Sequence, residues 1–282
     1  TTVFKRLMDI GDFIGIKGFV FRTQTGEISV HATSLTLLSK SLKPLPIVKY
    51  KDGVAYDKFD DPELRFRQRY VDLVVNDGVK ETFLQRATVV RTLRRVLDEA
   101  GYTEVETPTL QSIAGGASAR PFITHFNALD QDMYMRIATE LYLKRLIVGG
   151  FEGVYEIGKN FRNEGMDRNH NPEFTCMELY VQYKDYNWMM SFTEKLLETI
   201  CIAVNGKSER EIDGNIVSFK APYRRLPILD AIKEKTGFDC NGKTEEEIRA
   251  FCLEKGMDVD DTMGKGKLID ELFGEFCEGT FI

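Results

Sequence analysis

Cysteine is scarce in this 282-residue sequence, and none of the five cysteines forms a CxxC pair: Cys176, Cys201, Cys240, Cys252 and Cys277. An odd number without that spacing argues against a disulfide framework and against a zinc site. We therefore expect free thiols and a reducing compartment. His31 and His125 have no metal-ligand neighbours in the sequence, so we assign no metal-binding residue.

Long apolar runs are also missing, because no stretch reaches the roughly 18 apolar residues of a membrane span. The first residues lack the charged-then-apolar pattern of a signal peptide. We therefore expect a cytoplasmic protein without a membrane partner. Excess positive charge is absent too, since 38 basic and 44 acidic residues give a net charge of −6. A local basic patch would still suffice for nucleic acid.

The composition itself is that of a globular chain, with 43% hydrophobic and 29% charged residues, 23 glycines and 8 prolines. This excludes collagen-like, low-complexity and disordered classes. The length corresponds to about two domains. Because the chain starts without Met and runs almost at once into strand-like sequence, we expect it to be a segment of a longer protein.

Apolar periodicity divides the first part of the chain into three regions. Residues 12–33 predict a β-hairpin around a glycine-containing turn, which needs further strands to be stable. Residues 43–62 lose periodicity and gather Pro, Gly and Asp, which indicates a linker. Residues 79–100 then predict a helix that Gly101 ends, followed by a strand that ends at Pro108.

The remaining elements are predicted in the same way. We expect a hairpin over residues 122–137, strands over 154–164 and 173–183, a hairpin at Asp213-Gly214, and helices over about 139–149, 186–204, 227–236, 244–255 and 267–277. The last third of the chain is therefore predicted to be mostly helical.

The strands at 154–164 and 173–183 carry most of the polar chemistry. Alternation places functional groups on one face of each strand and apolar residues on the other. Pairing through the loop 165–172 would gather Arg162, Glu164, Phe174, Glu178 and Tyr180. An arginine suits a phosphate, a ring suits stacking on a base, and carboxylates suit a cationic group. A solvated strand face explains each residue alone, but not the whole arrangement.

These residues resemble a known family. FRNEG at 161–165 followed by RNHNPEFTCMELY at 168–180 is similar to motif 2 of class II aminoacyl-tRNA synthetases, in particular of the bacterial lysyl type. The helix at 80–100 with its following strand resembles motif 1, which forms the dimer in that family. The same lysyl pattern is matched at LRFRQRYVDL (64–73), GGASARPF (115–122) and 136–165.

The resemblance implies a fold and two domains. The fold would be α+β, with an antiparallel catalytic sheet flanked by helices and preceded by the last strands of an OB-type β-barrel. Residues 1–61 would be the end of the anticodon-binding domain with a linker. Residues 62–282 would be the catalytic domain with motifs 1 and 2 and a helical insertion over about 222–282. Motif 3 is not found, and GKGKL at 264–268 reads as the start of a helix.

The resemblance also implies a role for each matching residue. Arg162 would bind the ATP α-phosphate and the lysine carboxylate and act in catalysis. The rest of the ATP site would be Glu164 and Phe174 at adenine, with His170 and Asn171 near the nucleotide. The L-lysine site would consist of Gly116 and Glu140 at the α-amino group and of Glu178 and Tyr180 around the side-chain ammonium.

The implied reaction is ATP-dependent activation of L-lysine through a lysyl-adenylate, followed by transfer to tRNA(Lys) in a homodimer, with Mg²⁺ ligands outside this sequence. We expect the 282 residues alone to be inactive. Three alternatives stay open: an aspartyl or asparaginyl synthetase, a paralogue that ligates lysine to a protein, and a non-catalytic dimerising or binding module. An aspartate pocket would need basic residues in place of Glu140 and Glu178.

Overall fold

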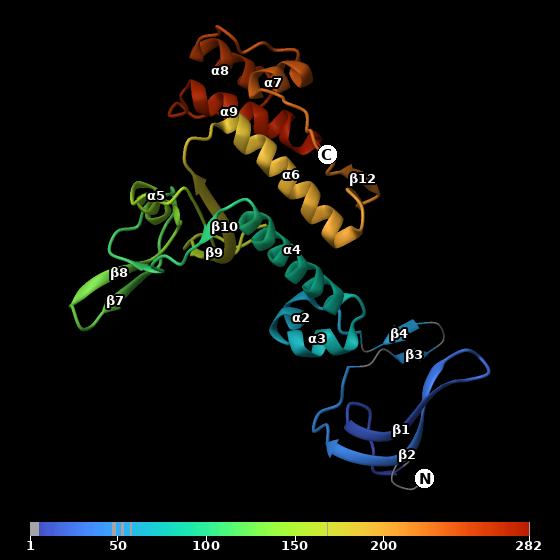
Figure 1. Cartoon of the computed structure of the whole chain (residues 1–282). Coiled ribbons are helices and arrows are strands. Elements are labelled where there is room, and N and C mark those ends of the chain that lie inside the picture. The colour runs from blue at the N-terminus through green and yellow to red at the C-terminus, as the bar shows by residue number, and fades with distance from the viewer. Residues whose placement is uncertain (1–5, 47–48, 52–53, 57, 168, 282) are drawn as a thin grey trace. The chain divides into compact units, whose positions relative to one another are not determined.

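The computed structural model describes residues 6–46, 49–51, 54–56, 58–167 and 169–281 (Figure 1). The chain divides into two compact units, Thr1–Ala87 and Thr88–Ile282, which are described separately. Helices and antiparallel strand pairs occur together, which confirms the predicted α+β class. The domain boundary expected after residue 61 stays a prediction.

The first unit contains two hairpins and short helices. β1 (Phe13–Arg22) pairs with β2 (Ile28–Ser39), which confirms the predicted hairpin and extends its second strand. A second hairpin is formed by β3 (Lys49–Lys51) and β4 (Val54–Tyr56), inside the stretch predicted to be a linker. Parts of that stretch, at 47–48, 52–53 and 57, lie outside the described residues. The assignment of these strands to the end of an OB-type barrel stays a prediction.

Helices α2 (Pro62–Arg67) and α3 (Arg69–Val75) are held together by a buried carboxylate. Asp72 accepts hydrogen bonds from Arg65 Nε at 2.8 Å and Asn76 Nδ2 at 2.7 Å and pairs with Arg69. Because the Asp72 side chain is fully buried, these donors offset the cost of removing its charge from water. Two arginines of this arginine-rich segment therefore have a structural role.

The second unit is built on a three-stranded sheet in the order β10-β9-β5. β9 (Gly153–Phe161) pairs antiparallel with β10 (Glu173–Val181) and parallel with β5 (Thr103–Glu104). Its apolar face packs against α4 (Val79–Glu99) and α6 (Tyr186–Asn205), where Trp188 and Phe192 stack at 5.1 Å. Met177, Leu179 and Val181 confirm the predicted apolar face, but the strand ends at Val181 and Tyr183, which was predicted to belong to that face, is exposed.

A second small sheet consists of β6 (Leu110–Gln111), β7 (Ile123–Phe126) and β8 (Gln131–Met135). Its strand order is β6-β8-β7. Helix α5 (Glu140–Val148) follows it directly. The predicted Asp213-Gly214 turn joins β11 (Glu209–Ile212) to β12 (Asn215–Ser218), with φ values of 49° and 81° at the two residues. Such values are required in the tight turn of a two-residue hairpin.

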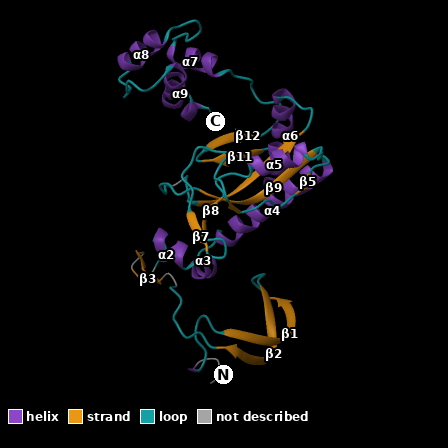
Figure 2. Cartoon of the chain, turned by 90° about the vertical axis from the view of Figure 1, so that its left-hand side faces the viewer, coloured by secondary structure: helices purple, strands orange, loops and turns teal. Residues whose placement is uncertain are grey.

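The C-terminal helices lie together at the end of the chain (Figure 2) and have a hydrophobic core of their own. They are α7 (Ile228–Thr236), α8 (Glu245–Glu254), α9 (Lys265–Phe276) and the short 3₁₀ turn η1 (Glu278–Thr280). The fully buried side chains include Ile232, Ile248, Leu268 and Leu272. α9 begins at Lys265, which confirms that GKGKL opens a helix. Within the described ranges, no helix has the length and apolar character needed to cross a bilayer.

Candidate active site

The register between β9 and β10 places the predicted polar residues on one face of the sheet. Phe174 stands opposite Asn160, and Glu178 stands opposite Glu156. Directly opposed residues of an antiparallel pair point to the same side, so these four side chains share a surface. This confirms the strand pairing predicted from the alternation.

A pocket of about 290 Å³ lies where β9 ends and β10 begins. The guanidinium carbon of Arg162 stands 5.2 Å from the centre of the Phe174 ring. The Nε of Arg162 is buried and has no hydrogen-bond partner among the described residues. All five residues predicted to bind ATP line this pocket, together with two others: Arg162, Glu164, Gly165, Asn169, His170, Asn171 and Phe174.

The loop between the two strands is ordered by Asp167, whose importance the sequence reasoning missed. Its carboxylate accepts hydrogen bonds from the backbone N–H groups of Asn169 at 2.7 Å and His170 at 2.8 Å, and contacts the His170 ring at 2.8 Å. The backbone N–H of Asn169, and next the His170 ring, lower the pKa of Asp167. An Asp two or three residues before such donors is the usual signal of this turn. Arg168 lies outside the described residues.

Arg120, in the segment 115–122, contacts the residues that follow β9. The backbone N–H of Arg120 donates to Glu164 Oε1 at 3.2 Å, and the Arg120 carbonyl accepts from the Asn163 N–H at 2.7 Å. This backbone contact fixes one carboxylate oxygen of Glu164 at the edge of the pocket. Arg120 is therefore a further residue of the site that no local spacing had indicated.

Glu178 is held by two hydroxyl groups. Thr139 Oγ1 donates to Glu178 Oε2 at 2.6 Å, and Tyr180 OH donates to Glu178 Oε1 at 2.5 Å. Burial, and then the bond to Glu178, raise the pKa of Tyr180, which keeps its phenol protonated as a donor. No described basic side chain forms an ion pair with Glu178. Thr139 had not been predicted in this role.

Gly116 and Glu140 lie side by side. A Cβ atom added at Gly116 would stand 3.1 Å from the Cβ of Glu140, and the φ of +88° at Gly116 favours glycine. Glu140 Oε1 pairs at 2.5 Å with Lys144 Nζ, which lies 5.8 Å from the centre of the Tyr180 ring. The four predicted lysine-site residues therefore form one continuous group, and their roles stay predictions.

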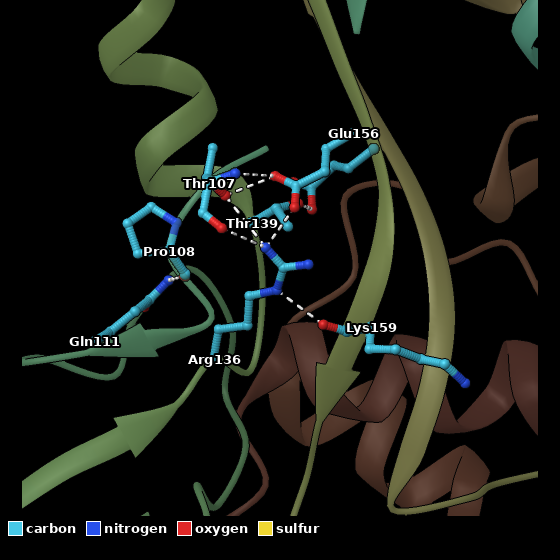
Figure 3. A network of polar contacts seen from close by, with 8 residues as sticks. Thr107, Pro108, Gln111, Arg136, Thr139, Glu156 and Lys159 are labelled. Carbon is cyan, nitrogen blue, oxygen red and sulfur yellow. Dashed lines mark hydrogen bonds and ion pairs between the residues drawn. The ribbon is translucent and has the colours of Figure 1, made fainter. Parts of the chain in front are cut away.

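A buried polar network lies beside this group (Figure 3). Arg136 and Glu156, each 4% exposed, form an ion pair at 2.5 Å. The other Glu156 oxygen accepts from Thr107 Oγ1 at 2.6 Å and from the Thr107 N–H at 3.2 Å. Arg136 also donates from Nε to the Lys159 carbonyl at 2.8 Å. Sequence reasoning did not assign a role to either member of this pair.

The two ends of the site are connected along β10. Phe174 and Glu178 are four residues apart, which corresponds to about 13 Å along a strand. Cys176 stands between them, and burial, followed by the charge of Glu178, raises its pKa, while Arg162 and Arg136 act in the opposite direction. An extended ligand could therefore contact Glu178 at one end and Phe174 at the other.

Magnesium has no evident ligands in the described part of the chain. Among those residues, no group of three or more His, Cys, Asp or Glu side chains is placed to hold a metal ion. The residues described here thus do not fit a metal site, and no step below is routed through one.

Comparison with known proteins assigns the family. Residues 61–268 match the family of class II tRNA synthetases described as "D, K and N", and the chain belongs to this family. It is 62% identical over 281 residues to a lysine-tRNA ligase of Porphyromonas gingivalis strain W83, covering 100% of this chain and 49% of the relative.

Two further relatives carry the same name. The chain is 62% identical to the lysine-tRNA ligases of Azobacteroides pseudotrichonymphae and Christiangramia forsetii, covering 99% of this chain and 56% and 49% of those proteins. The chain thus spans about half the length of the relatives it matches.

Proposed function

We propose that this chain supplies the ATP and L-lysine binding residues of a lysine-tRNA ligase, which activates L-lysine with ATP through a lysyl-adenylate and transfers the lysyl group to tRNA(Lys). Residues 1–282 alone are expected to be inactive. The observation that carries the proposal is the single sheet face that holds Glu178 and, toward its other end, Phe174 and the pocket around Arg162. The names of the relatives favour lysine among the substrates of the family.

The reaction needs no nucleophile from the protein. A lysine carboxylate oxygen attacks the α-phosphorus of ATP, the bond from that phosphorus to the bridging oxygen breaks, and pyrophosphate leaves with the electron pair. Negative charge on the α-phosphoryl oxygens is stabilised by Arg162, whose buried Nε has no other described partner. The Phe174 ring would stack on the adenine of ATP.

The opposite end of the site suits the substrate's cationic groups. A lysine side chain needs an acceptor in a buried site, and a carboxylate partner makes the loss of its hydration tolerable. Glu178 supplies that carboxylate, already held in place by two hydroxyl donors. Glu140, beside Gly116, would take the α-amino group.

The test is amino-acid-dependent exchange of pyrophosphate into ATP, measured with lysine, aspartate and asparagine. It is run on residues 1–282 and on the natural protein as its source cell makes it. Lysine-dependent exchange by the natural protein supports the proposal, and comparable exchange by residues 1–282 would overturn the expectation that these residues alone are inactive. Exchange with aspartate or asparagine would assign another member of the family, and lysine transfer to a protein instead of tRNA would assign a modifying paralogue. A natural protein that binds none of these amino acids would be a non-catalytic module.

Glu178→Gln should weaken L-lysine binding by about 1.5 to 3 kcal/mol, as expected for loss of a hydrogen bond to a charged group. Glutamine keeps the shape of the side chain but removes the negative charge. ATP affinity should change far less, because Phe174, where adenine is proposed to bind, is about 13 Å from Glu178 along the strand. Calorimetry with both ligands checks this, and equal weakening of both would remove Glu178 from the lysine site.

Phe174→Ala should weaken ATP binding by about 1 to 3 kcal/mol, the range for stacking of a base on an aromatic ring. Lysine binding without ATP should be nearly unchanged. Phe174→Trp is the matched control, since it keeps an aromatic face and should retain most of the ATP affinity. Titration with ATP measures both variants, and an unchanged ATP dissociation constant in Phe174→Ala would end the stacking assignment.

Three further properties belong to the same proposal. The helix α4 and the strand after it would form a homodimer interface, as the resemblance to motif 1 implies. The enzyme would act in the cytoplasm, which agrees with five free cysteines. tRNA(Lys) and Mg²⁺ would be bound in the complete protein.

A further inference from the structure

Two carboxylates stand directly opposite each other on neighbouring strands. Glu156 of β9 is the register partner of Glu178 of β10, so both side chains leave the sheet on the same side. Like charges in such a position repel and destabilise a strand pair. The repulsion between the two carboxylates must therefore be reduced by the groups that surround them.

Glu156 is fully compensated. Its Oε1 pairs with Arg136 at 2.5 Å, and its Oε2 accepts two hydrogen bonds from Thr107, so both oxygens are occupied. Arg136 is held on its other side by the carbonyls of Lys159 and Thr107, at 2.8 and 3.1 Å (Figure 3). With both partners 4% exposed, the negative charge of Glu156 is cancelled inside the protein.

Glu178 receives hydrogen bonds from neutral groups only. The hydroxyls of Thr139 and Tyr180 fix its two oxygens, but neither carries a positive charge. The ammonium of Lys144 lies 5.8 Å from the centre of the Tyr180 ring, but it forms its ion pair with Glu140. Glu156 faces Glu178 in the strand register, Glu140 and Cys176 influence the pKa of its partner Tyr180, and Arg136 and Arg162 influence the pKa of Cys176.

We propose that Arg136 sets the charge selectivity of the lysine pocket, because it cancels Glu156 and leaves Glu178 as the single uncancelled carboxylate of the facing pair. This inference rests on the proposed function, in which lysine is the substrate. Arg136 does not touch the substrate in this scheme and is a positioning residue. The pocket then accepts one side-chain ammonium and disfavours a neutral side chain of the same length.

The decisive variant is Glu156→Gln, which keeps the hydrogen-bonding shape but leaves Arg136 without its counter-ion. The guanidinium then compensates Glu178 across the strand pair, and the pocket loses its net negative charge. L-norleucine has the lysine side chain without its ammonium and therefore reports charge selectivity. We expect the ratio of the norleucine to the lysine dissociation constant to fall at least tenfold in Glu156→Gln.

The double variant Arg136→Met/Glu156→Gln should restore this ratio to within about threefold of the wild-type value. It removes both charges of the pair and again leaves Glu178 uncancelled. Replacing a buried ion pair by uncharged side chains of similar size is often tolerated, so the double variant is expected to fold. A structural role alone would not give this pattern, because it would change lysine, norleucine and ATP binding together.

A suppressor variant tests the same idea from the opposite direction. Glu178→Gln alone should lose the selectivity, and Arg136→Met added to it frees Glu156, directly opposite, so that one carboxylate is again uncancelled. The selectivity should then return at least in part. Glu63→Gln, in the exposed pair with Arg67 where both side chains are 73% exposed, is the matched control and should change nothing.

All variants are measured by calorimetry in the natural protein, with circular dichroism to confirm folding. A folded Glu156→Gln protein with an unchanged ratio overturns the inference. If that variant does not fold, Glu178→Gln is compared with Glu178→Gln/Arg136→Met: a return of the ratio supports the inference and no return overturns it. A wild-type protein that does not bind lysine would instead refute the proposed function.

Discussion

Arg162→Ala should lower lysine-dependent pyrophosphate exchange by about a hundredfold or more, the effect of removing one donor to a developing negative charge. Arg162 stands over the Phe174 ring, and its buried Nε has no described partner. Both features suit a group kept ready for an anion. Since the stabilised charge develops in the transition state, the loss should appear mainly in kcat and less in the KM for ATP.

The control for this variant is Arg162→Lys. Lysine keeps the positive charge but lacks the planar fork of donors, so exchange should remain well below the wild-type rate and above that of the alanine variant. The fold should survive both changes, because the side chain lines a pocket outside the hydrophobic core. Near-normal exchange by a folded Arg162→Ala protein would exclude Arg162 from the mechanism.

The strands that carry the site could be predicted because their signal is local. Within β10, Met177, Leu179 and Val181 alternate with Glu178 and Tyr180, and this apolar face does pack into the core formed with Leu97, Tyr102 and Tyr155. Once one face is buried, a shift of one residue would bury Glu178 in that core, so the register is strongly specified. The shared surface of Phe174 and Glu178 follows from that pattern alone.

The supporting residues could not be predicted in the same way, since their contacts join distant parts of the chain. Arg136 reaches Glu156 across 20 residues and Thr107 across 29, and Thr139 reaches Glu178 across 39. No helical or strand period connects such positions. The resemblance to a family indicated the residues expected to contact the ligands, and left out the groups that hold them.

The hairpin of β3 and β4 was missed for a different reason. Its strands have three residues each, which is too short for an alternation to be recognised, and the surrounding Pro, Gly and Asp are typical of a linker. The C-terminal helices, in contrast, were predicted to within a few residues. Each has a capping or stop signal beside a clear apolar face, such as the Thr244–Glu247 capping box of α8.

Gly158→Ala should destabilise the protein by about 3 to 5 kcal/mol, the cost of breaking a buried ion pair. A Cβ atom at position 158 would overlap the guanidinium of Arg136 and lie 3.2 Å from Glu156 Oε1. The guanidinium has little freedom to move away, because its Nε is bonded to the Lys159 carbonyl and its NH1 to Thr107. Because Gly158 has no side chain, it leaves the space that the Arg136–Glu156 ion pair occupies.

Chemical denaturation of the natural protein measures this effect, with Gly165→Ala as the matched control. A Cβ atom at Gly165 would meet nothing within 4 Å, so that variant should differ from wild type by less than about 0.5 kcal/mol. Adding Arg136→Met to Gly158→Ala removes the overlap but leaves Glu156 uncompensated, and should not restore stability. Adding Glu156→Gln as well removes both charges and should recover most of it. Equal stability of Gly158→Ala and Gly165→Ala would show that Arg136 can leave Glu156 at little cost, and the ion pair would then lose its part in the fold.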